Sequence, residues 1–271
     1  MQRFNSHSVI YTDRSLPPIM KIPVTLSIVS EYLHISEDPK PLLSVKINGD
    51  VSKVINDFIL GKKPNLDAYF ERDYVRFMST EKGLVIPGNT VKGAIRSRLE
   101  LLMDCACYNS LGNRPSKSKS NTYISIYHPK RKQSDRFDPY RNKYICYVCN
   151  LFGNAGLASR VNFSDLEFQE GKVDFITIKG IIYEVARRGS TFKGNIILDN
   201  PQPHEIGMLL YGAGYRGQGK WKTLLLGRFK YEMKDFGRVK FNIQINNADS
   251  YLNAFLSLHK GHIHDVEEDW K

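Results

Sequence analysis

The sequence predicts an α+β protein with a ferredoxin-like core and large insertions, and three observations lead to this prediction. The predicted elements follow the order strand, helix, strand, strand, helix, strand, which is the plan of that fold. The 271 residues, 41% of them hydrophobic, supply an ample core. Two long segments, at about 37–83 and 105–149, interrupt the periodic pattern and are interpreted as insertions. We therefore expect a single domain over residues 1–271.

The first predicted core element is a strand. Val24, Leu26 and Ile28 alternate with polar residues, which predicts a half-buried strand near residues 22–34. The first insertion follows, and prolines, lysines and glycines break its pattern. Only a short helical stretch is expected within it, at about 51–60.

The clearest helix in the sequence comes next, and it carries the first candidate phosphate contacts. Asn89 or Thr90 can cap its N-terminus, and Arg98 interrupts its apolar face, so the stem of that arginine must snorkel. Lys92 and Arg96 lie four residues apart on one flank, near the positive end of the helix dipole. Such an end can hold a phosphate, although the same residues also suit an ordinary solvated flank.

The second half of the core is predicted from alternating residues and turn signals. Residues 161–168 indicate a strand with a bulge, and 175–185 a second strand. The segment 186–194 then predicts a basic hairpin with Gly189 and Gly194 at its turns. The remaining predicted elements are a helix beginning near Pro203, an alternating strand at 239–245 and an amphipathic helix at 250–261.

The four cysteines form two close pairs that predict a metal site. Cys146 and Cys149 have the Cys-x2-Cys spacing of a zinc knuckle, and in a reducing compartment such a pair favours a metal over a disulfide. Cys105 and Cys107 have the less common Cys-x-Cys spacing, so His128 is an alternative ligand, and burial of this pair in a helix is an alternative explanation. We expect a structural zinc that closes a loop.

The charge balance narrows the class of partner. Lys and Arg number 39 against 28 Asp and Glu, and the net charge of +11 favours a polyanion, although charge alone does not choose among RNA, DNA and an anionic membrane. Residues 109–143 mix cations with tyrosine and phenylalanine, which suits single-stranded nucleic acid as well as it suits a solvated loop. No apolar run approaches the roughly 18 residues of a membrane span, and no signal-peptide core is evident, so we expect a cytoplasmic protein without a membrane partner.

The stretch LLYGAGYRGQGKWKT invites comparison with nucleotide-binding loops. Gly214, Gly219 and Lys220 fit the core of a phosphate loop, but Trp221 occupies the position where such a loop needs serine or threonine. The glycines also follow a predicted helix and not a strand, which is the wrong context for either nucleotide motif. We therefore expect tight turns here, with the neighbouring cations, such as Lys222, available to RNA.

Three stretches of the sequence together point to one known family. LVIPGNTVKGAIRSRLE supplies an Ile-Pro-Gly motif followed by Lys-Gly-x-x-Arg, CYVCNLFGNAGLASRVNFSDL supplies Leu-Phe-Gly followed by Ser-Arg-x-x-Phe-x-Asp, and LGRFKYEMKDFGRVKF supplies a diluted glycine-rich motif. From about residue 22 to 245 the chain thus resembles the RAMP superfamily of CRISPR-associated proteins. It looks most like the backbone subunit of type III effector complexes, of the Csm or Cmr type.

This resemblance implies an RRM-like core that binds guide RNA. Copies of such a subunit would form a helical oligomer along the guide, beside other RAMP subunits and the large subunit, with a thumb hairpin at about 183–198. A zinc-binding insertion in some family members corresponds to the segment from Cys105 to Cys149. The RNA-binding residues implied or suggested by position are Lys92, Arg96, Arg160, Arg187, Arg188 and Phe192.

The resemblance also implies a catalytic candidate. Active members carry an aspartate before the Ile-Pro-Gly motif that supports target-RNA cleavage with a divalent cation, Mg or Mn, and Asp73 stands near that place, with Glu71 and Asp67 as substitutes. Such a carboxylate can hold the cation or orient the 2′-hydroxyl of the target. Two alternatives stay open: a purely structural guide-RNA-binding subunit, and a metal-independent guide-processing endoribonuclease that uses His34 or His204 as general base.

Overall fold

The computed structural model describes most of the chain, with gaps in both insertions. The described residues are 8–10, 12–13, 18–36, 43–45, 51–63, 70–72, 74–104, 106, 121–128, 144–154 and 156–270. Within these ranges the helices are α1 (Val51–Ile59), α2 (Gly88–Leu102), α3 (Asn121–Tyr127), α4 (Tyr147–Phe152), α5 (Pro203–Gly212) and α6 (Ala248–Leu258). The early strands are β1 (Ser8–Ile10), β2 (Ile19–Ile28), β3 (Tyr32–Leu33), β4 (Leu43–Val45), β5 (Phe70–Arg72), β6 (Tyr74–Val75), β7 (Ser79–Thr80) and β8 (Gly83–Ile86). The later strands are β9 (Tyr144–Cys146), β10 (Val161–Phe163), β11 (Leu166–Glu170), β12 (Val173–Ile178), β13 (Ile181–Arg187), β14 (Thr191–Asp199), β15 (Leu224–Leu225) and β16 (Arg238–Ile243).

The central sheet has the strand order that defines the ferredoxin-like fold. β2 lies between β16 and β14, β14 also pairs with β10 and β11, and all of these pairings are antiparallel. The order β16-β2-β14-β11 therefore reproduces the four core strands of that plan, and β8, β7 and β15 extend the sheet at its edges. The predicted fold class is confirmed.

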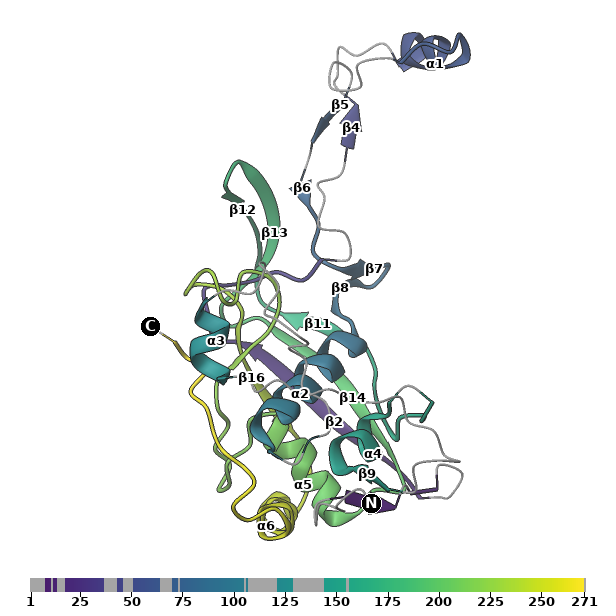
Figure 1. Ribbon diagram of the computed structural model, residues 1–271. Coiled ribbons are helices and arrows are strands. Elements are labelled where there is room, and N and C mark those ends of the chain that lie inside the picture. Colours follow the sequence, from purple (N-terminus) through teal and green to yellow (C-terminus); the bar gives the residue numbers. More distant parts are fainter. Residues whose placement is uncertain are drawn as a thin grey trace.

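Helices α2 and α5 cover one face of this sheet, and α6 packs on α5 (Figure 1). Alternate residues of β2, including Leu26, point into the core, where they meet Ile95 of α2 and Leu209 of α5. The contact between α5 and α6 is close, because a Cβ atom added at Gly207 would lie 2.0 Å from the Tyr251 carbonyl oxygen. Glycine at this position therefore permits the approach of the two helices.

Helix α2 begins without the predicted cap. Pro87 occupies the N-cap position, and neither Asn89 nor Thr90 serves as the cap. Instead, the backbone N–H of Gly88 donates to a carboxylate oxygen of Asp165 at 2.9 Å. Asp165 comes from the loop between β10 and β11, and a Cβ at Gly88 would lie 2.1 Å from the carbonyl oxygen of Phe163 in that region. The cap is therefore supplied by tertiary structure, which local sequence could not indicate.

A hairpin that projects from the body is formed by β12 and β13 (Figure 1). Its turn lies at Lys179 and Gly180, both with positive φ, so the single strand predicted at 175–185 is two strands. The basic segment near Gly189 is a tight turn at the hairpin base, while Gly194 lies inside β14 and pairs with Val24. The projecting hairpin thus spans 173–187, earlier in the chain than the expected 183–198.

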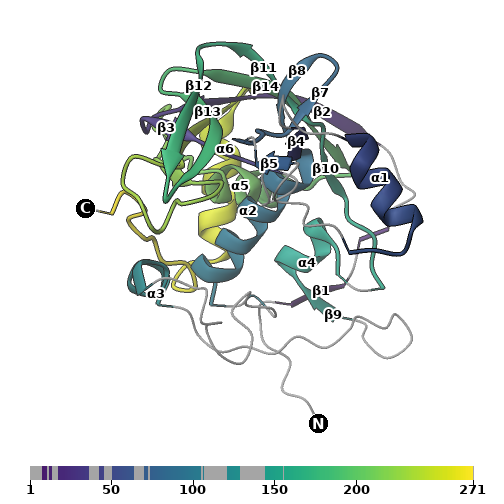
Figure 2. The ribbon, with the colours of Figure 1, turned by 90° about the horizontal axis from the view of Figure 1, so that it is seen from above.

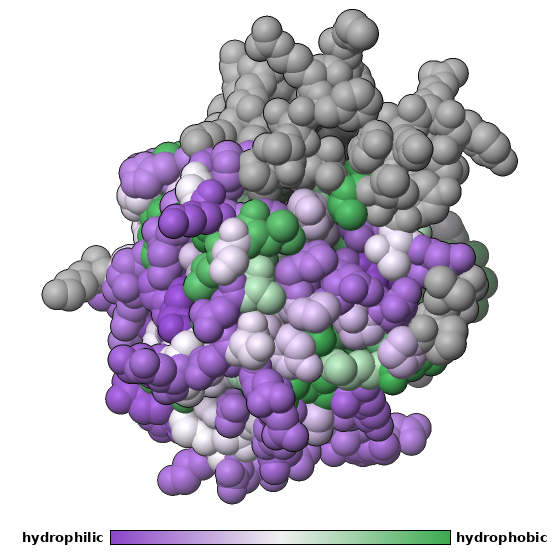
Figure 3. Space-filling model, turned by 90° about the horizontal axis from the view of Figure 1, so that it is seen from below, coloured by the Kyte–Doolittle hydropathy of each residue, from purple (hydrophilic) through white to green (hydrophobic). Residues whose placement is uncertain are grey.

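The first insertion forms an arm on the same end of the molecule as the hairpin. β4 pairs with β5, α1 lies at the tip, and β6 joins the hairpin by pairing in parallel with β13 (Figure 1). The helical stretch expected at 51–60 is present as α1, and its apolar side chains, such as Phe58 and Ile59, are exposed. The surface at the opposite end of the molecule is largely hydrophilic and carries only small hydrophobic patches where it is coloured (Figure 3).

The second insertion contributes elements that flank α2. Figure 2 shows α3 on one side of α2 and α4 on the other. α3 packs through Tyr123 and Tyr127 against Leu101 and Leu225, while α4 and β9 belong to the main core. Most of the basic stretch at 109–143 lies outside the described residues. None of the helices in the described ranges is long and apolar enough to cross a membrane.

Candidate nucleic-acid interface

Arginine side chains lie over aromatic rings where the hairpin and the arm leave the body. The pairing of β6 with β13 places Tyr74 beside Ile182, so these elements share one base. The pairs, with the distance from guanidinium carbon to ring centroid, are Arg187 and Tyr32 at 5.6 Å, Arg76 and Tyr74 at 5.7 Å, and Arg228 and Phe229 at 5.1 Å. Arg76 and Arg228 were not predicted from sequence, because only the fold brings these local arginine–aromatic pairs to the base of the hairpin. We call this group the hairpin-base cluster.

The cations of this region differ in how far their charge is compensated. Arg187 pairs with Glu31 and, at 3.1 Å, with Asp174, and this pairing lowers the pKa of Glu31. Arg188 lies 3.7 Å from Glu31 but its side chain is 66% exposed. In the described part of the chain Arg76 has no ion-pair partner. The cluster thus presents cations to solvent beside aromatic rings, a combination suited to phosphate and base together.

Lys92 and Arg96 lie together on the α4 side of α2, as the spacing predicted. The Arg96 Nε atom donates to Glu100 at 2.7 Å, and its guanidinium reaches Cys149 Sγ at 3.8 Å. Burial raises the pKa of Glu100 to about 7, against the opposing effect of Arg96. Burial and the neighbouring Arg96 lower the pKa of Lys92. Of the two cations, Lys92 is the better placed to meet a phosphate, because Arg96 is already held by a carboxylate.

Arg160 and Phe192 are removed from the RNA-contacting set, because the structure buries both completely. Arg160 pairs with Glu205 and also donates to the Asn200 carbonyl at 2.8 Å. Phe192 lies in the core. The Ser-Arg motif therefore ties the start of β10 to the first turn of α5, where Glu205 also accepts from the Gln202 N–H at 2.9 Å.

The catalytic candidate Asp73 lies outside the described residues, as does Asp67, and only the backbone of Glu71 is described, in β5. The structure does describe the next residue, Tyr74, which belongs to β6 and pairs with β13 of the projecting hairpin. The Tyr74 ring also meets Phe175 of that hairpin at 4.9 Å between centroids. Tyr74, which follows the candidate in the sequence, thus belongs to the hairpin-base cluster.

The cysteine site is described only in part. Cys105 and Cys107 lie outside the described residues, whereas Cys146 and Cys149 are buried at the start of α4. The Cys146 Sγ atom accepts from the Cys149 N–H at 3.4 Å, an arrangement that also suits a metal-bound thiolate. No group of three or more metal-ligating side chains occurs among the described residues, His128 included.

The histidine alternatives differ in their access to a substrate. His34 is fully buried, its Nδ1 lies 2.7 Å from the Glu184 carbonyl oxygen, and burial lowers its pKa. Its ring lies against Phe77 and Tyr183, so it cannot reach an RNA from this position. His204 is half-buried against Tyr147, with a pKa also lowered by burial. The geometry of His34 is that of a core residue.

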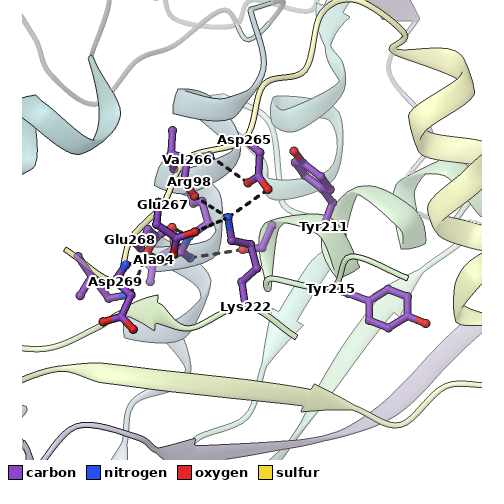
Figure 4. Close-up of polar contacts among 12 residues, drawn as sticks. Ala94, Arg98, Tyr211, Tyr215, Lys222, Asp265, Val266, Glu267, Glu268 and Asp269 are labelled. Carbon is purple, nitrogen blue, oxygen red and sulfur yellow. Dashed lines mark hydrogen bonds and ion pairs between the residues drawn. The ribbon is translucent and has the colours of Figure 1, made fainter. Parts of the chain in front are cut away.

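The cations of the glycine-rich stretch, which were expected to be available to RNA, form ion pairs within the protein. Gly214, Gly217 and Gly219 all have positive φ in turns after α5, as expected. Lys222, however, lies 3.1 Å from Asp265 (Figure 4). Arg216 pairs with the same carboxylate at 2.8 Å. These cations are therefore not free for RNA. Their partners belong to the acidic tail, which we define as residues 262–270.

The acidic tail also explains Arg98, which does not snorkel as predicted. Its side chain is 4% exposed and forms two hydrogen bonds to the Glu268 carboxylate, at 2.5 and 2.7 Å (Figure 4). Glu268 in turn accepts from the Leu225 N–H at 2.9 Å. Farther along, Asp269 pairs with Arg238 at 2.7 Å. No local pattern near Arg98 could reveal a partner 170 residues away.

The sheet order, the helices on one face and the arginine–aromatic cluster together define a ferredoxin-like protein with an interface suited to RNA. The family model of the RAMP superfamily matches residues 40–261. The chain therefore belongs to the RAMP superfamily, a family of CRISPR-associated RNA-binding proteins. Comparison with curated proteins found no match.

Proposed function

We propose that this protein is a guide-RNA-binding backbone subunit of a type III CRISPR interference complex. The observation that carries the proposal is the hairpin-base cluster, where arginines and aromatic rings meet at the foot of two projections. Membership in the RAMP superfamily supports RNA and other subunits of a CRISPR complex as partners. The guide RNA, the target RNA, further RAMP subunits and the large subunit belong to this proposal.

The hairpin can act on the path of the guide. Val173, Phe175 and Ile182 are large apolar side chains that remain exposed on it. Apolar side chains can pack against or between bases, while Arg188 and Arg76 at the foot can meet the backbone on either side. This division of roles would bend a single strand at the hairpin and hold it at the base. Lys92 on α2 can supply a further phosphate contact.

The test is equilibrium binding of the purified chain to a single-stranded RNA of roughly 40 nucleotides across a salt series. We expect a steep loss of affinity with salt, and Arg76→Ala or Arg188→Ala should each reduce the slope by about 0.7. Lys260→Ala, an exposed cation just after α6, is the control and should leave the slope unchanged. Weak binding with no salt dependence would contradict the proposal.

We further propose that Asp73 supports metal-dependent cleavage of the target RNA. The proposal is supported by Tyr74, the next residue in the chain, which pairs with β13 and meets Phe175 of the hairpin. A bound Mg or Mn ion would supply charge stabilisation, while the protein positions the target strand. In the assembled complex, Asp73→Asn should abolish cleavage and leave target binding unchanged. Cleavage at the wild-type rate would contradict the Asp73 assignment.

The four cysteines remain a proposed zinc site. Cys146 and Cys149 lie together on one turn with a thiol that accepts a backbone N–H, which supports half of the ligand set. Purified protein should contain about one zinc per chain, and Cys149→Ser should lose it together with thermal stability. His128→Ala is the matched variant: zinc retained there favours four thiolates, and zinc lost favours His128 as a ligand. Protein that is stable without zinc would refute the site.

A further inference from the structure

A cavity of about 550 Å³ lies on the other side of α2 from Lys92 and Arg96. It opens between α2, α3 and the segment 225–231, and its volume is in the range of small-molecule sites. The residues that define its chemistry are Thr90, Gly93 and Ser97 of α2, Tyr127 of α3, and Lys230 and Tyr231. The hairpin-base cluster does not include these residues.

The α2 wall of the cavity includes a run of small side chains, beside Arg98 and Leu101. Thr90, Gly93, Ala94 and Ser97 follow one face of the helix at helical spacing. A Cβ atom added at Gly93 would meet no heavy atom within 4 Å, so open space begins directly at the helix backbone. A flat ring can therefore approach α2 closely, and the Ser97 hydroxyl can offer a hydrogen bond to its edge.

The opposite wall is aromatic. Tyr231 is partly exposed and meets Tyr123 at 5.2 Å and Tyr127 at 6.4 Å between ring centroids, with both pairs edge to face. The two tyrosines of α3 are almost fully buried and hold the Tyr231 ring in place. A fixed aromatic ring opposite a small-residue face is suited to stacking with a heterocyclic base.

Lys230 adds a positive charge to this cavity. Its ammonium lies 5.2 Å from the centroid of the Tyr231 ring, and among the described residues it has no ion-pair partner. Burial lowers its pKa to about 8, the nearby Arg98 acts in the same direction, and Glu268 opposes both. A desolvated cation that forms no direct ion pair can be stabilised further by an anionic ligand.

The acidic tail fixes this wall before any ligand arrives. The indole N–H of Trp270 donates to the Lys230 carbonyl oxygen at 3.0 Å, and Glu268 holds the Leu225 N–H. Arg98 at the back of the cavity is already paired with Glu268, so it does not compete with Lys230 for an anion. Binding would therefore require little ordering of the chain.

We propose that this cavity is a nucleotide-binding slot, in which a base packs between the small-residue face of α2 and Tyr231 while a phosphate oxygen meets Lys230. The inference rests on the proposed RNA-binding function. The ligand chemistry, an aromatic base that carries a phosphate, can come from one residue of a bound RNA or from a free mononucleotide.

Two variants that act from opposite walls test the slot. Gly93→Leu fills the space in front of α2, and Lys230→Met removes the charge but keeps the stem. Their matched controls are Gly93→Ala and Lys234→Met, an exposed lysine of the same loop. Each full-length protein is titrated with single-stranded RNA, with AMP and UMP, and with inorganic phosphate. We expect both slot variants to weaken RNA binding about tenfold and both controls to stay within about twofold of wild type.

The outcomes separate the slot from the function on which it rests. If the wild type and both slot variants bind RNA equally well, the proposal of a nucleotide-binding slot is refuted and the proposed function still stands. If the wild type binds a mononucleotide but not RNA, and both slot variants lose this binding, the slot holds a free nucleotide and the proposed function is contradicted. Absence of RNA and mononucleotide binding in the wild type overturns both. If Gly93→Leu does not fold, Tyr231→Ala replaces it, with Tyr231→Phe as control.

Discussion

Arg160 shows how a motif cation can serve the fold and not the ligand. Its sequence context gave no sign of burial, since its partners come from the end of β14, the residue that follows it and the start of α5. Lys92 and Arg188, by contrast, were predicted as cations on accessible elements, and they lie on such elements. Exposure of a charge depends on distant chain segments, so residue type and spacing alone could not separate the two cases.

Replacement of Arg160 should therefore cost stability, and replacement of Arg188 should not. Arg160→Ala leaves the buried Glu205 carboxylate without its cation, and we expect a loss of about 3 to 5 kcal/mol in the free energy of unfolding. Arg188→Ala removes an exposed pair and should cost less than about 1 kcal/mol. Urea denaturation measures both. Equal stabilities would mean that the buried pair adds nothing to the fold.

Glu100 makes the stability of the protein depend on pH, and its raised pKa determines the direction of the change. Its pKa is raised from 4.5 to about 7 by burial, so between these values the folded state holds a proton that the unfolded state has lost. Stability should fall as pH rises through this window. From about pH 5 to pH 8 the wild type should lose about 1 to 3 kcal/mol more than Glu100→Gln. Parallel pH profiles of the two proteins in denaturant titrations would contradict this assignment.

At the scale of elements, periodicity predicted the core well and turns poorly. The alternation in β2 and the apolar face of α2 arise from burial against a single core, so they are visible in the sequence. The hairpin turn at Lys179 and Gly180 was missed because apolar residues continue on both sides of it. Gly194 is predicted from sequence to lie in a turn, yet it lies in β14 against Ser164 and Leu166, where only the fold requires a small residue.

The packing of α5 on α6 predicts opposite effects for two helical glycines. Gly207→Ala places a methyl group 2.0 Å from the Tyr251 carbonyl oxygen, so the helices must separate, and we expect a loss of about 1 to 3 kcal/mol. Gly93→Ala meets open space and should be neutral or stabilise by up to about 1 kcal/mol. Thermal unfolding of the two variants provides the comparison. A stable Gly207→Ala protein would show that α6 can move away without cost.

At the scale of the whole molecule, the acidic tail and the insertions determine which cations are paired and which are exposed, and local sequence could not predict this. The hairpin-base cluster joins residues from β3, β6, β13 and the loop after β15, so the pair of Arg187 with Tyr32 and the meeting of all three pairs follow only from the assembled topology. The family motifs led to Lys92 but could not show that the acidic tail takes Arg216 and Lys222. Asp73 and the first cysteine pair fall outside the described residues and stay predictions.

Loss of one tail carboxylate should unfold the protein more readily than loss of its neighbour. Glu268→Ala leaves Arg98 charged and buried and removes the acceptor of the Leu225 N–H, so we expect a cost of about 3 to 5 kcal/mol. The Glu267 side chain is 70% exposed and lies 3.5 Å from Lys222. Glu267→Ala should therefore lower the free energy of unfolding by less than about 1 kcal/mol. Calorimetric unfolding of both variants tests the contrast. Similar melting temperatures would mean that the tail is not part of the core.

The sheet order also determines when the protein can fold during synthesis. β2 leaves the ribosome first among the four core strands, yet its two neighbours, β14 and β16, are translated far later. Until then both edges of β2 expose unpaired backbone groups and an apolar face, the features that promote aggregation of nascent chains. Translation at ordinary rates, on the order of 5 to 20 residues per second, leaves this strand unpartnered for roughly ten seconds or more. Production of intact protein should therefore benefit from slow, cool expression with chaperones that hold extended segments.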